Sequence, residues 1–145
     1  MTDNAALARE VYDAWNSRDY DRLAAAMAPD GKTILVPTGQ TFDGPDGARQ
    51  SSMVWAEAFP DGAITVERVV AEGDHVAVEY TGHGTHTGTF TTPMGSIPAT
   101  GRSVTLQMCD FIEFKDGKVA VQRQYFDTGS LMAQLGVASG QTATT

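Results

Sequence analysis

The segment Lys115-Asp116-Gly117-Lys118 constrains the fold of this chain more than any other stretch of the sequence. An Asp-Gly pair between two runs of alternating apolar residues is typical of a two-residue hairpin with a type I′ turn, because both central residues must adopt positive φ. Such a turn also fixes which residues of the two strands face one another. The segment therefore predicts an antiparallel ribbon formed by strands over 103–114 and 118–126.

The register of this ribbon draws attention to three charged residues. If the first lysine of the turn pairs with the second, alternation of side chains with period two places charged groups on the apolar face of the ribbon, which should meet the helices. These charged residues are Asp110, Arg123 and Asp127. Because charges persist in an apolar layer mainly when they are paired or used, we interpret the three residues as candidates for function.

Structural roles for the same residues stay open. Asp110 and Arg123, which this register places opposite each other, can form a cross-strand ion pair near a wet rim. Asp127 can serve as an N-cap, because residues 128–131 open a last short helix and aspartate is favoured at that position. Capping and catalysis are compatible, since a capping carboxylate at the end of a sheet can still point into a cavity.

Periodicity of apolar residues divides the rest of the chain into a helical half and a strand half. Helical spacing predicts helices over about 3–15, 19–27 and 44–59, with turn chemistry at 29–31 and a short strand over 34–36. Alternation predicts further strands over 64–70 and 74–90, and the glycine- and proline-containing segment 91–101 is expected to be a long loop and a candidate lid.

This order of elements predicts the fold class. Helices first and strands afterwards indicate a single α+β domain over 1–137, with a curved, mostly antiparallel sheet. Three N-terminal helices should pack on one face of the sheet, and a short C-terminal helix should follow it. Residues 138–145 are small, polar and aperiodic, and we expect them to form a flexible tail.

Composition excludes several classes of function. The chain carries 18 acidic and 10 basic residues, a net charge of −8, and has no basic cluster, so nucleic acid is not an expected partner. Its single cysteine, Cys109, allows no intrachain disulfide and fits a reducing cytoplasm. No apolar run approaches the length of a membrane span, and residues 1–10 lack the features of a signal peptide, so we expect a cytoplasmic protein that does not associate with membranes.

Motif spacing argues against metal and nucleotide chemistry. His83 and His86 are three residues apart, which places them on opposite faces of a regular strand, and no other ligand motif accompanies them, so no metal site is expected. Tyr80, Gly82, Gly84 and His86 share one parity of the predicted strand. The two glycines indicate either a bend or the close approach of a ligand, and a bulge at that point would reverse the direction of His86.

Several motifs, taken in order, resemble one known family. They are Phe59-Pro60-Asp61, Val70-Ala71-Glu72-Gly73-Asp74-His75-Val76, Gly84-Thr85-His86-Thr87-Gly88, Thr100-Gly101-Arg102, Asp116-Gly117-Lys118-Val119, and Tyr125-Phe126-Asp127 followed by Leu131 and Gln134-Leu135-Gly136. In these motifs the chain resembles the SnoaL-like polyketide cyclases, within the nuclear transport factor 2-like or ketosteroid isomerase-like superfamily. The resemblance implies a cone-shaped α+β fold with a pocket between the helices and the concave sheet. It also implies a homo-oligomer, either a dimer, often formed through the sheets, or a tetramer.

The resemblance further implies an activity. Asp127 matches the aspartate that precedes the last helix in the family, so it would be the acid/base residue of a cofactor-independent intramolecular aldol cyclisation of a small hydrophobic, polyketide-like ligand. Many members have tryptophan where this chain has Arg123, which suggests the hypothesis that the substrate carries a carboxylate or an enolate oxygen.

The remaining candidate residues take supporting roles in this hypothesis. His86, Arg123 and Tyr125 are candidate donors to the developing oxyanion. Candidates for the walls of the pocket, each of which can equally be plain core, are Trp15, Trp55, Phe59 and Met108.

Other functions of the same fold remain as alternatives. An isomerase would use the same carboxylate as a cyclase. An epoxide hydrolase would need two carboxylates around an arginine, an arrangement that Asp110, Arg123 and Asp127 could imitate. A small-molecule-binding module without chemistry is the third alternative, because fold alone does not define function.

Overall fold

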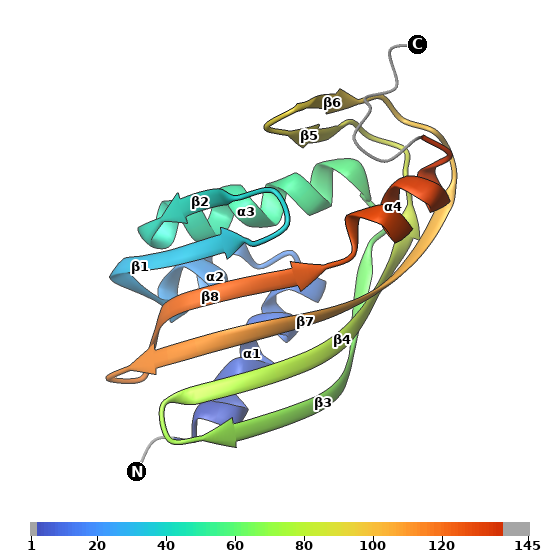
Figure 1. The fold of residues 1–145 in the computed structure, drawn as a ribbon. Coiled ribbons are helices and arrows are strands. Elements are labelled where there is room, and N and C mark those ends of the chain that lie inside the picture. The colour runs from blue at the N-terminus through green and yellow to red at the C-terminus, as the bar shows by residue number, and fades with distance from the viewer. Residues whose placement is uncertain (1–2, 138–145) are drawn as a thin grey trace.

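The computed structural model describes residues 3–137, which form an α+β domain (Figure 1). Its elements in chain order are α1 (Asn4–Asn16), α2 (Tyr20–Ala26), β1 (Met27–Leu35), β2 (Gln40–Asp43), α3 (Gly44–Ala58), β3 (Ala63–Glu72), β4 (His75–Thr85), β5 (Phe90–Thr92), β6 (Gly95–Ile97), β7 (Ser103–Lys115), β8 (Lys118–Phe126) and α4 (Thr128–Leu135). The predicted tail over 138–145 lies outside the described residues.

One curled sheet and three helices make the two layers of the domain. The sheet has six strands in the order β2-β1-β8-β7-β4-β3, and α1, α2 and α3 lie behind it in Figure 1, against its concave face. The short β5–β6 hairpin and α4 lie together at one end of the sheet, where β4 ends, β7 begins and β8 ends. The predicted α+β class, with three N-terminal helices on a curved sheet and a short C-terminal helix, is confirmed.

The helices begin where local chemistry favours them. Asp3 caps α1 by accepting a hydrogen bond from the backbone N–H of Ala6, and Asp19 caps α2 in the same way. Proline in the first turn of α3 needs no intrahelical donor there. The buried face of α1 carries Tyr12, which becomes important below.

The N-terminal side of the sheet differs from the prediction. Instead of a turn at 29–31 and a short strand, β1 follows α2 directly and runs from Met27 to Leu35. It pairs with β8 in parallel, so the sheet is mixed rather than purely antiparallel. Pairing with β8 is irregular between Met27 and Lys32, the part that contains Pro29, because proline cannot donate to a ladder. The sequence pattern also missed β2, a four-residue strand at the edge.

The segment predicted as a long loop is partly a hairpin. Within 91–101 the β5–β6 pair forms, and strand β4 ends at Thr85 rather than near 90. Phe90 and Ile97 anchor the hairpin in an apolar cluster at this end of the domain. The hairpin is therefore attached to the core by buried side chains on both of its strands.

The predicted hairpin of β7 and β8 forms, but its register slips by one residue. Lys115 pairs with Lys118 and Phe114 with Val119, as predicted, and Glu113 then pairs with Val121, so that Ala120 forms a β-bulge. A one-residue slip turns all later side chains of a strand to the opposite face. Beyond the bulge, the register that placed Asp110 opposite Arg123 is therefore wrong.

The slip changes which side chains of β8 point inward. Asp110 pairs with Gln124, and Gln122 is buried beside it, while Arg123 lies on the outer face and forms an ion pair with Glu113 at 3.1 Å. The inward residues of β8 are therefore amides instead of a cation.

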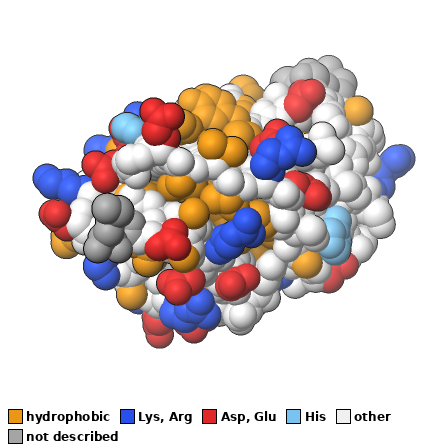
Figure 2. Space-filling view, turned by 90° about the horizontal axis from the view of Figure 1, so that it is seen from below, with side chains coloured by type: hydrophobic (Ala, Val, Ile, Leu, Met, Phe, Trp, Pro, Cys, Tyr) orange, Lys and Arg blue, Asp and Glu red, His pale blue; other side chains and the backbone are white. Residues whose placement is uncertain are grey.

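The surface carries charges of both signs. Figure 2 shows acidic and basic side chains interspersed around a strip of hydrophobic side chains on the face seen from below. Over residues 3–137, no helix is long and apolar enough to cross a membrane.

Two alanine substitutions on β8 test the register. Arg123→Ala should lower the free energy of unfolding by less than about 1 kcal/mol, because it removes a half-exposed ion pair. Gln122→Ala should lower it by about 2 kcal/mol, because it removes a donor to a buried carboxylate. Urea unfolding of both variants measures the two values, and the reverse order would contradict the bulge.

Candidate functional site

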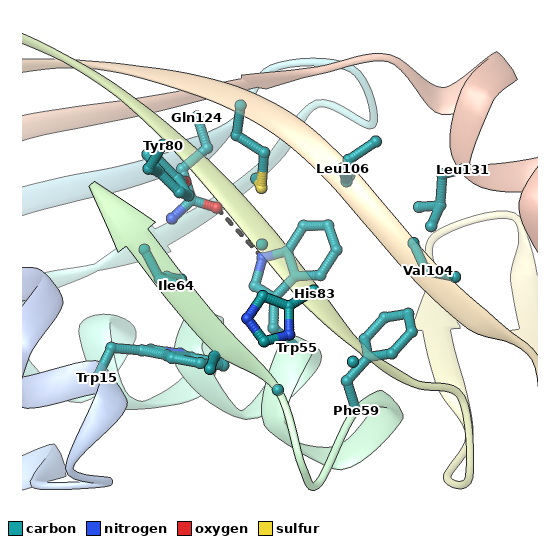
Figure 3. Close-up of a pocket in the computed structure, with 15 residues that line it drawn as sticks. Trp15, Trp55, Phe59, Ile64, Tyr80, His83, Val104, Leu106, Gln124 and Leu131 are labelled. Atoms are coloured by element: carbon teal, nitrogen blue, oxygen red, sulfur yellow. Dashed lines mark hydrogen bonds between the residues drawn. The ribbon is translucent and has the colours of Figure 1, made fainter. Parts of the chain in front are cut away.

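An apolar cavity of about 60 Å³ lies between the helices and the concave face of the sheet (Figure 3). Helices α1, α3 and α4 and strands β3, β4, β7 and β8 contribute its walls, which are lined by Trp15, Trp55, Phe59, Gly62, Ala63, Ile64, Tyr80, Gly82, His83, Gly84, Val104, Leu106, Met108, Gln124 and Leu131. No Asp, Glu, Lys or Arg is among these described lining residues. The cavity therefore suits an uncharged, largely apolar ligand.

The four apolar residues predicted as pocket walls all line this cavity: Trp15, Trp55, Phe59 and Met108. Two of their contacts fix the tryptophans in place. The indole N–H of Trp55 donates to the amide oxygen of Gln124 at 3.3 Å, the dashed line in Figure 3. Arg18 stacks over Trp15 and donates to the carbonyl oxygens of Pro60 and Gly62, which ties α1 to the turn before β3.

The two glycines of β4 have different reasons to be glycine. A Cβ added at Gly82 would find its nearest neighbours only at 4.0 Å, so this glycine leaves open space on the cavity wall. A Cβ at Gly84 would lie 3.1 Å from both the Cα of Gly62 and the Cβ of Phe59, so there the turn before β3 packs closely against the strand. Gly82 therefore leaves room on the cavity wall, whereas Gly84 allows close packing of two backbone segments, a reason that the sequence did not indicate.

Asp110 lies at the centre of a buried hydrogen-bond network beside the cavity. Its carboxylate has no exposed surface and accepts three hydrogen bonds. The Tyr80 hydroxyl donates to Oδ1 at 2.8 Å, while the Tyr12 hydroxyl and the Gln122 amide donate to Oδ2 at 2.8 and 2.9 Å. The tyrosine rings pack against each other with centroids 4.9 Å apart. Three separate elements, α1, β4 and β8, thus converge on one side chain of β7.

Burial shifts the pKa values of this network. Loss of solvent raises the pKa of Asp110 from 3.8 to about 6, although the hydrogen bonds from Gln122, Tyr12 and Tyr80 favour the charged form and oppose the shift. Burial, followed by the negative charge of Asp110, raises the pKa of both tyrosines well above 10. The network therefore combines a carboxyl that titrates near neutral pH with hydroxyls that keep their protons.

Tyr80 connects this network to the cavity. Its side chain is buried and lines the cavity, whereas Asp110 does not line it. A ligand in the cavity can therefore touch the hydroxyl-bearing side chain that donates to Asp110, which links the carboxyl to the cavity. The other titratable lining residue is His83, whose side chain is exposed.

Besides Asp110 and His86, three predicted site residues do not line the cavity. Asp127 is exposed and caps α4, accepting hydrogen bonds from the backbone N–H groups of Gly129 and Ser130 at 2.8 and 3.2 Å. The capping role is confirmed, and the expectation that this carboxylate also opens into the pocket is wrong. Arg123 and Tyr125 point to the outer face because of the bulge, so their expected contact with a substrate in the cavity is wrong as well.

His86 is fully buried behind the cavity wall. Its Nδ1 accepts a hydrogen bond from the backbone N–H of Thr100 at 3.1 Å, which leaves the proton of a neutral ring on Nε2. Burial lowers its pKa, so the neutral form is favoured. The ring packs against Phe59, which separates it from the cavity that Phe59 lines. His86 therefore has no direct contact with the cavity.

Sequence reasoning missed Tyr12, Tyr80, Gln122 and Gln124 as site residues. A signal for the tyrosines was present, because both lie at buried positions of their elements and a buried hydroxyl needs an acceptor. Asp110 was the inward carboxylate on the facing strand. The glutamines could not be found, because their inward direction depends on the bulge at Ala120.

Within residues 3–137 there is no group of three or more His, Cys, Asp and Glu side chains that could hold a metal ion.

Comparison with known proteins places the chain in a family. The sequence model of the SnoaL-like polyketide cyclases matches residues 5–135, and the chain belongs to this family. No curated protein matched the chain.

Solved structures share the whole fold. A proposed SnoaL-like polyketide cyclase from Jannaschia sp. CCS1 is 26% identical, with a TM-score of 0.81 and coverage of 91% of this chain and 90% of the other. IdmH, a proposed polyketide cyclase from Streptomyces antibioticus, is 28% identical, with a TM-score of 0.76 and coverage of 94% and 100%. AclR, a proposed hydroxylase from Streptomyces galilaeus, is 27% identical, with a TM-score of 0.75 and coverage of 90% and 83%. Proteins with different proposed reactions thus share this architecture.

The raised pKa of Asp110 predicts a pH-dependent loss of stability. Because the folded state holds this proton more tightly than the unfolded state, the contribution is fully present below pH 3.8 and is lost as pH rises through about 6. The shift corresponds to about 3 kcal/mol. Urea unfolding between pH 4 and 7 should show the difference in stability between wild type and Asp110→Asn falling by most of this amount, and a difference independent of pH would contradict a buried, titrating carboxyl.

Substitutions at Asp127 separate capping from a role in the cavity. Asp127→Ala should lower the free energy of unfolding by about 1 kcal/mol. Asp127→Ser should cause a much smaller decrease, because serine caps almost as well as aspartate. Thermal and urea unfolding measure both variants. Equal losses in the two would show that the carboxylate does something other than cap α4.

Proposed function

We propose that this protein is a cofactor-independent cyclase that closes a ring in a neutral, polyketide-like substrate by intramolecular aldol-type addition. The observation that carries the proposal is the hydrogen bond from Tyr80, a residue of the cavity wall, to Asp110, a carboxyl sealed from solvent. Membership of the SnoaL-like polyketide cyclase family supports the substrate class.

Tyr80 and Asp110 can move a proton together. A methylene group between two carbonyl centres loses its proton to the Tyr80 oxygen while the Tyr80 hydroxyl proton passes to Oδ1 of Asp110. The C–H electron pair remains on the substrate as an enolate, and no tyrosinate has to accumulate in a site that strongly disfavours it. The charge of the carboxylate is thereby transferred to the substrate.

Ring closure reverses the proton movement. The enolate carbon attacks an internal carbonyl, which forms the new C–C bond and an alkoxide. The alkoxide then takes the Tyr80 proton as Asp110 returns its own, so the network ends in its starting state. General acid–base catalysis of this kind contributes about 10²–10⁴-fold.

The cavity supplies the geometry of the reaction. Its aromatic walls, Trp15, Trp55 and Phe59, exclude water and restrict a flexible chain to compact conformations, which raises the rate of an intramolecular step. The described lining contains no Lys or Arg, which favours a neutral substrate. The acidic substrate that was inferred from Arg123 is therefore disfavoured. Asp110, Arg123 and Asp127 do not come together, because Arg123 pairs with Glu113 on the outer face and Asp127 caps α4, which disfavours the epoxide-hydrolase alternative.

Turnover by matched variants tests the proposal. On a panel of neutral poly-β-ketone esters and enones, Tyr80→Phe and Asp110→Asn should lower kcat by about 10²–10⁴-fold, since each interrupts the proton path. Asp127→Asn, which keeps the cap, should retain wild-type turnover. Circular dichroism and thermal unfolding establish that each variant is folded. Full turnover by Tyr80→Phe, or its loss in Asp127→Asn, would contradict the proposed roles.

A binding module is the second candidate, because no carboxylate is among the described residues that line the cavity. Gly82→Val, which fills open space on the wall, should abolish ligand binding in a thermal-shift screen under both hypotheses. Binding by wild type without turnover of any member of the panel would favour the module. An isomerase would instead turn over the enones and leave the poly-β-ketone esters unchanged.

A further inference from the structure

A second cavity lies on the other side of the Asp110 network. It has a volume of about 40 Å³, is partly open, and lies between α1, α2, α3, β1 and β8. Its lining is richer in hydroxyl and amide groups than that of the first cavity and consists of Val11, Tyr12, Trp15, Leu23, Ala26, Met27, Thr33, Ala48, Ser51, Ser52, Val119, Gln122 and Gln124. Trp15 and Gln124 line both cavities.

Thr33 gives this cavity an unpartnered polar group. The residue is 2% exposed, and its hydroxyl oxygen has no hydrogen-bond partner in the described part of the chain. Its position on β1 is in register with Gln122 on β8, so both lie in the same wall. Buried hydroxyls are rarely left without a partner, which indicates that something in the cavity satisfies Thr33.

Size and lining identify the occupant as water. By the same measure of volume, one water needs about 10–15 Å³ and two to four polar partners, so the cavity accommodates about three. The hydroxyls of Ser51 and Ser52 donate to the carbonyl of Ala48 and keep their acceptor capacity. We propose that this cavity is a hydrated chamber in which ordered water bridges Thr33 and Tyr12 and exchanges protons with Asp110.

Tyr12 is the connection between the chamber and the carboxyl. Its hydroxyl donates to Oδ2 of Asp110, whereas Tyr80 donates to Oδ1 from the substrate side. When a proton enters, chamber water donates one proton to the Tyr12 oxygen as the original Tyr12 proton moves to Oδ2, and solvent restores the proton that the water gave. The polar groups that face the carboxyl from the packed elements are Tyr12 on α1, Tyr80 on β4 and Gln122 on β8, and none is cationic.

The chamber gives Asp110 a route to solvent protons that does not pass through the substrate cavity. The carboxyl can therefore reach its protonation equilibrium while a ligand covers Tyr80. This inference is independent of the proposed function, because it holds equally for a protein that only binds its ligand.

Water contacts measured by NMR test the chamber directly. Nuclear Overhauser cross-peaks should join long-lived water to the methyl groups of Thr33, Ala48 and Val119 in the wild-type protein. Thr33→Ser, which keeps the hydroxyl, should retain the cross-peaks at the other two methyls. Their absence in the wild type would overturn the proposal.

The stability of Thr33→Val is a second test, because a hydrated and a dry cavity predict opposite changes in the unfolding equilibrium constant. If water satisfies the hydroxyl, its replacement by a methyl group should raise the unfolding equilibrium constant about three- to tenfold. In a dry cavity the same change removes an unsatisfied group and should lower the constant, which would overturn the proposal.

Proton exchange completes the test. The hydroxyl proton of Tyr12 should exchange with solvent faster than that of Tyr80, and Thr33→Val should slow the exchange of Tyr12 alone. Faster exchange at Tyr80, or a Tyr12 rate unchanged by Thr33→Val, would contradict the relay.

Discussion

A carboxyl group with no exposed surface is the constraint around which this domain is organised. Burying the Asp110 carboxylate without partners would be strongly unfavourable, so the fold must supply donors from every side. Tyr12 comes from the helical layer, Tyr80 and Gln122 from two strands that flank β7. The interaction therefore joins α1 to the sheet.

The same network contributes residues to two cavities of different character, which also share Trp15 and Gln124. The apolar one presents Tyr80 to a ligand, and the more polar one presents Tyr12 and Gln122. Because the two tyrosines donate to different oxygens of one carboxyl, a change in its protonation state alters a hydrogen bond of each tyrosine. The arrangement offers proton chemistry in the apolar cavity without placing a charge in its wall.

Much of the fold follows from local sequence signals, and the limits of prediction have physical causes. Helix caps at Asp3 and Asp127 and the Asp-Gly turn act within a few residues, so the sequence shows them directly. The parallel pairing of β1 with β8 joins segments about ninety residues apart and leaves no local pattern. Four residues of the apolar cavity wall were predicted as candidates, three of them large aromatic residues in or next to the helices that pack on the sheet, whereas the other lining residues were not.

The identity of the working carboxyl was harder to predict for a specific reason. A single bulged residue, Ala120, decides whether Arg123 or its neighbours point inward, and alanine carries no signal for a bulge. The position of Asp127 before the last helix correctly indicated capping. Because its carboxylate accepts hydrogen bonds from the N-terminus of α4 at the surface, it does not reach the cavity. Asp110 was found from its parity on β7, while its partners on α1 and β4 depend on tertiary packing.

The titration of Asp110 itself tests this account most directly. Selective ¹³C labelling of aspartate carboxyl groups, with the signal assigned by its loss in Asp110→Asn, gives the midpoint by NMR. The account predicts a midpoint of about 6, above that of the exposed aspartates. A midpoint near 3.8, the ordinary value of a solvated carboxyl, would show that the group is not sealed beneath the cavity and would contradict the proposed proton path.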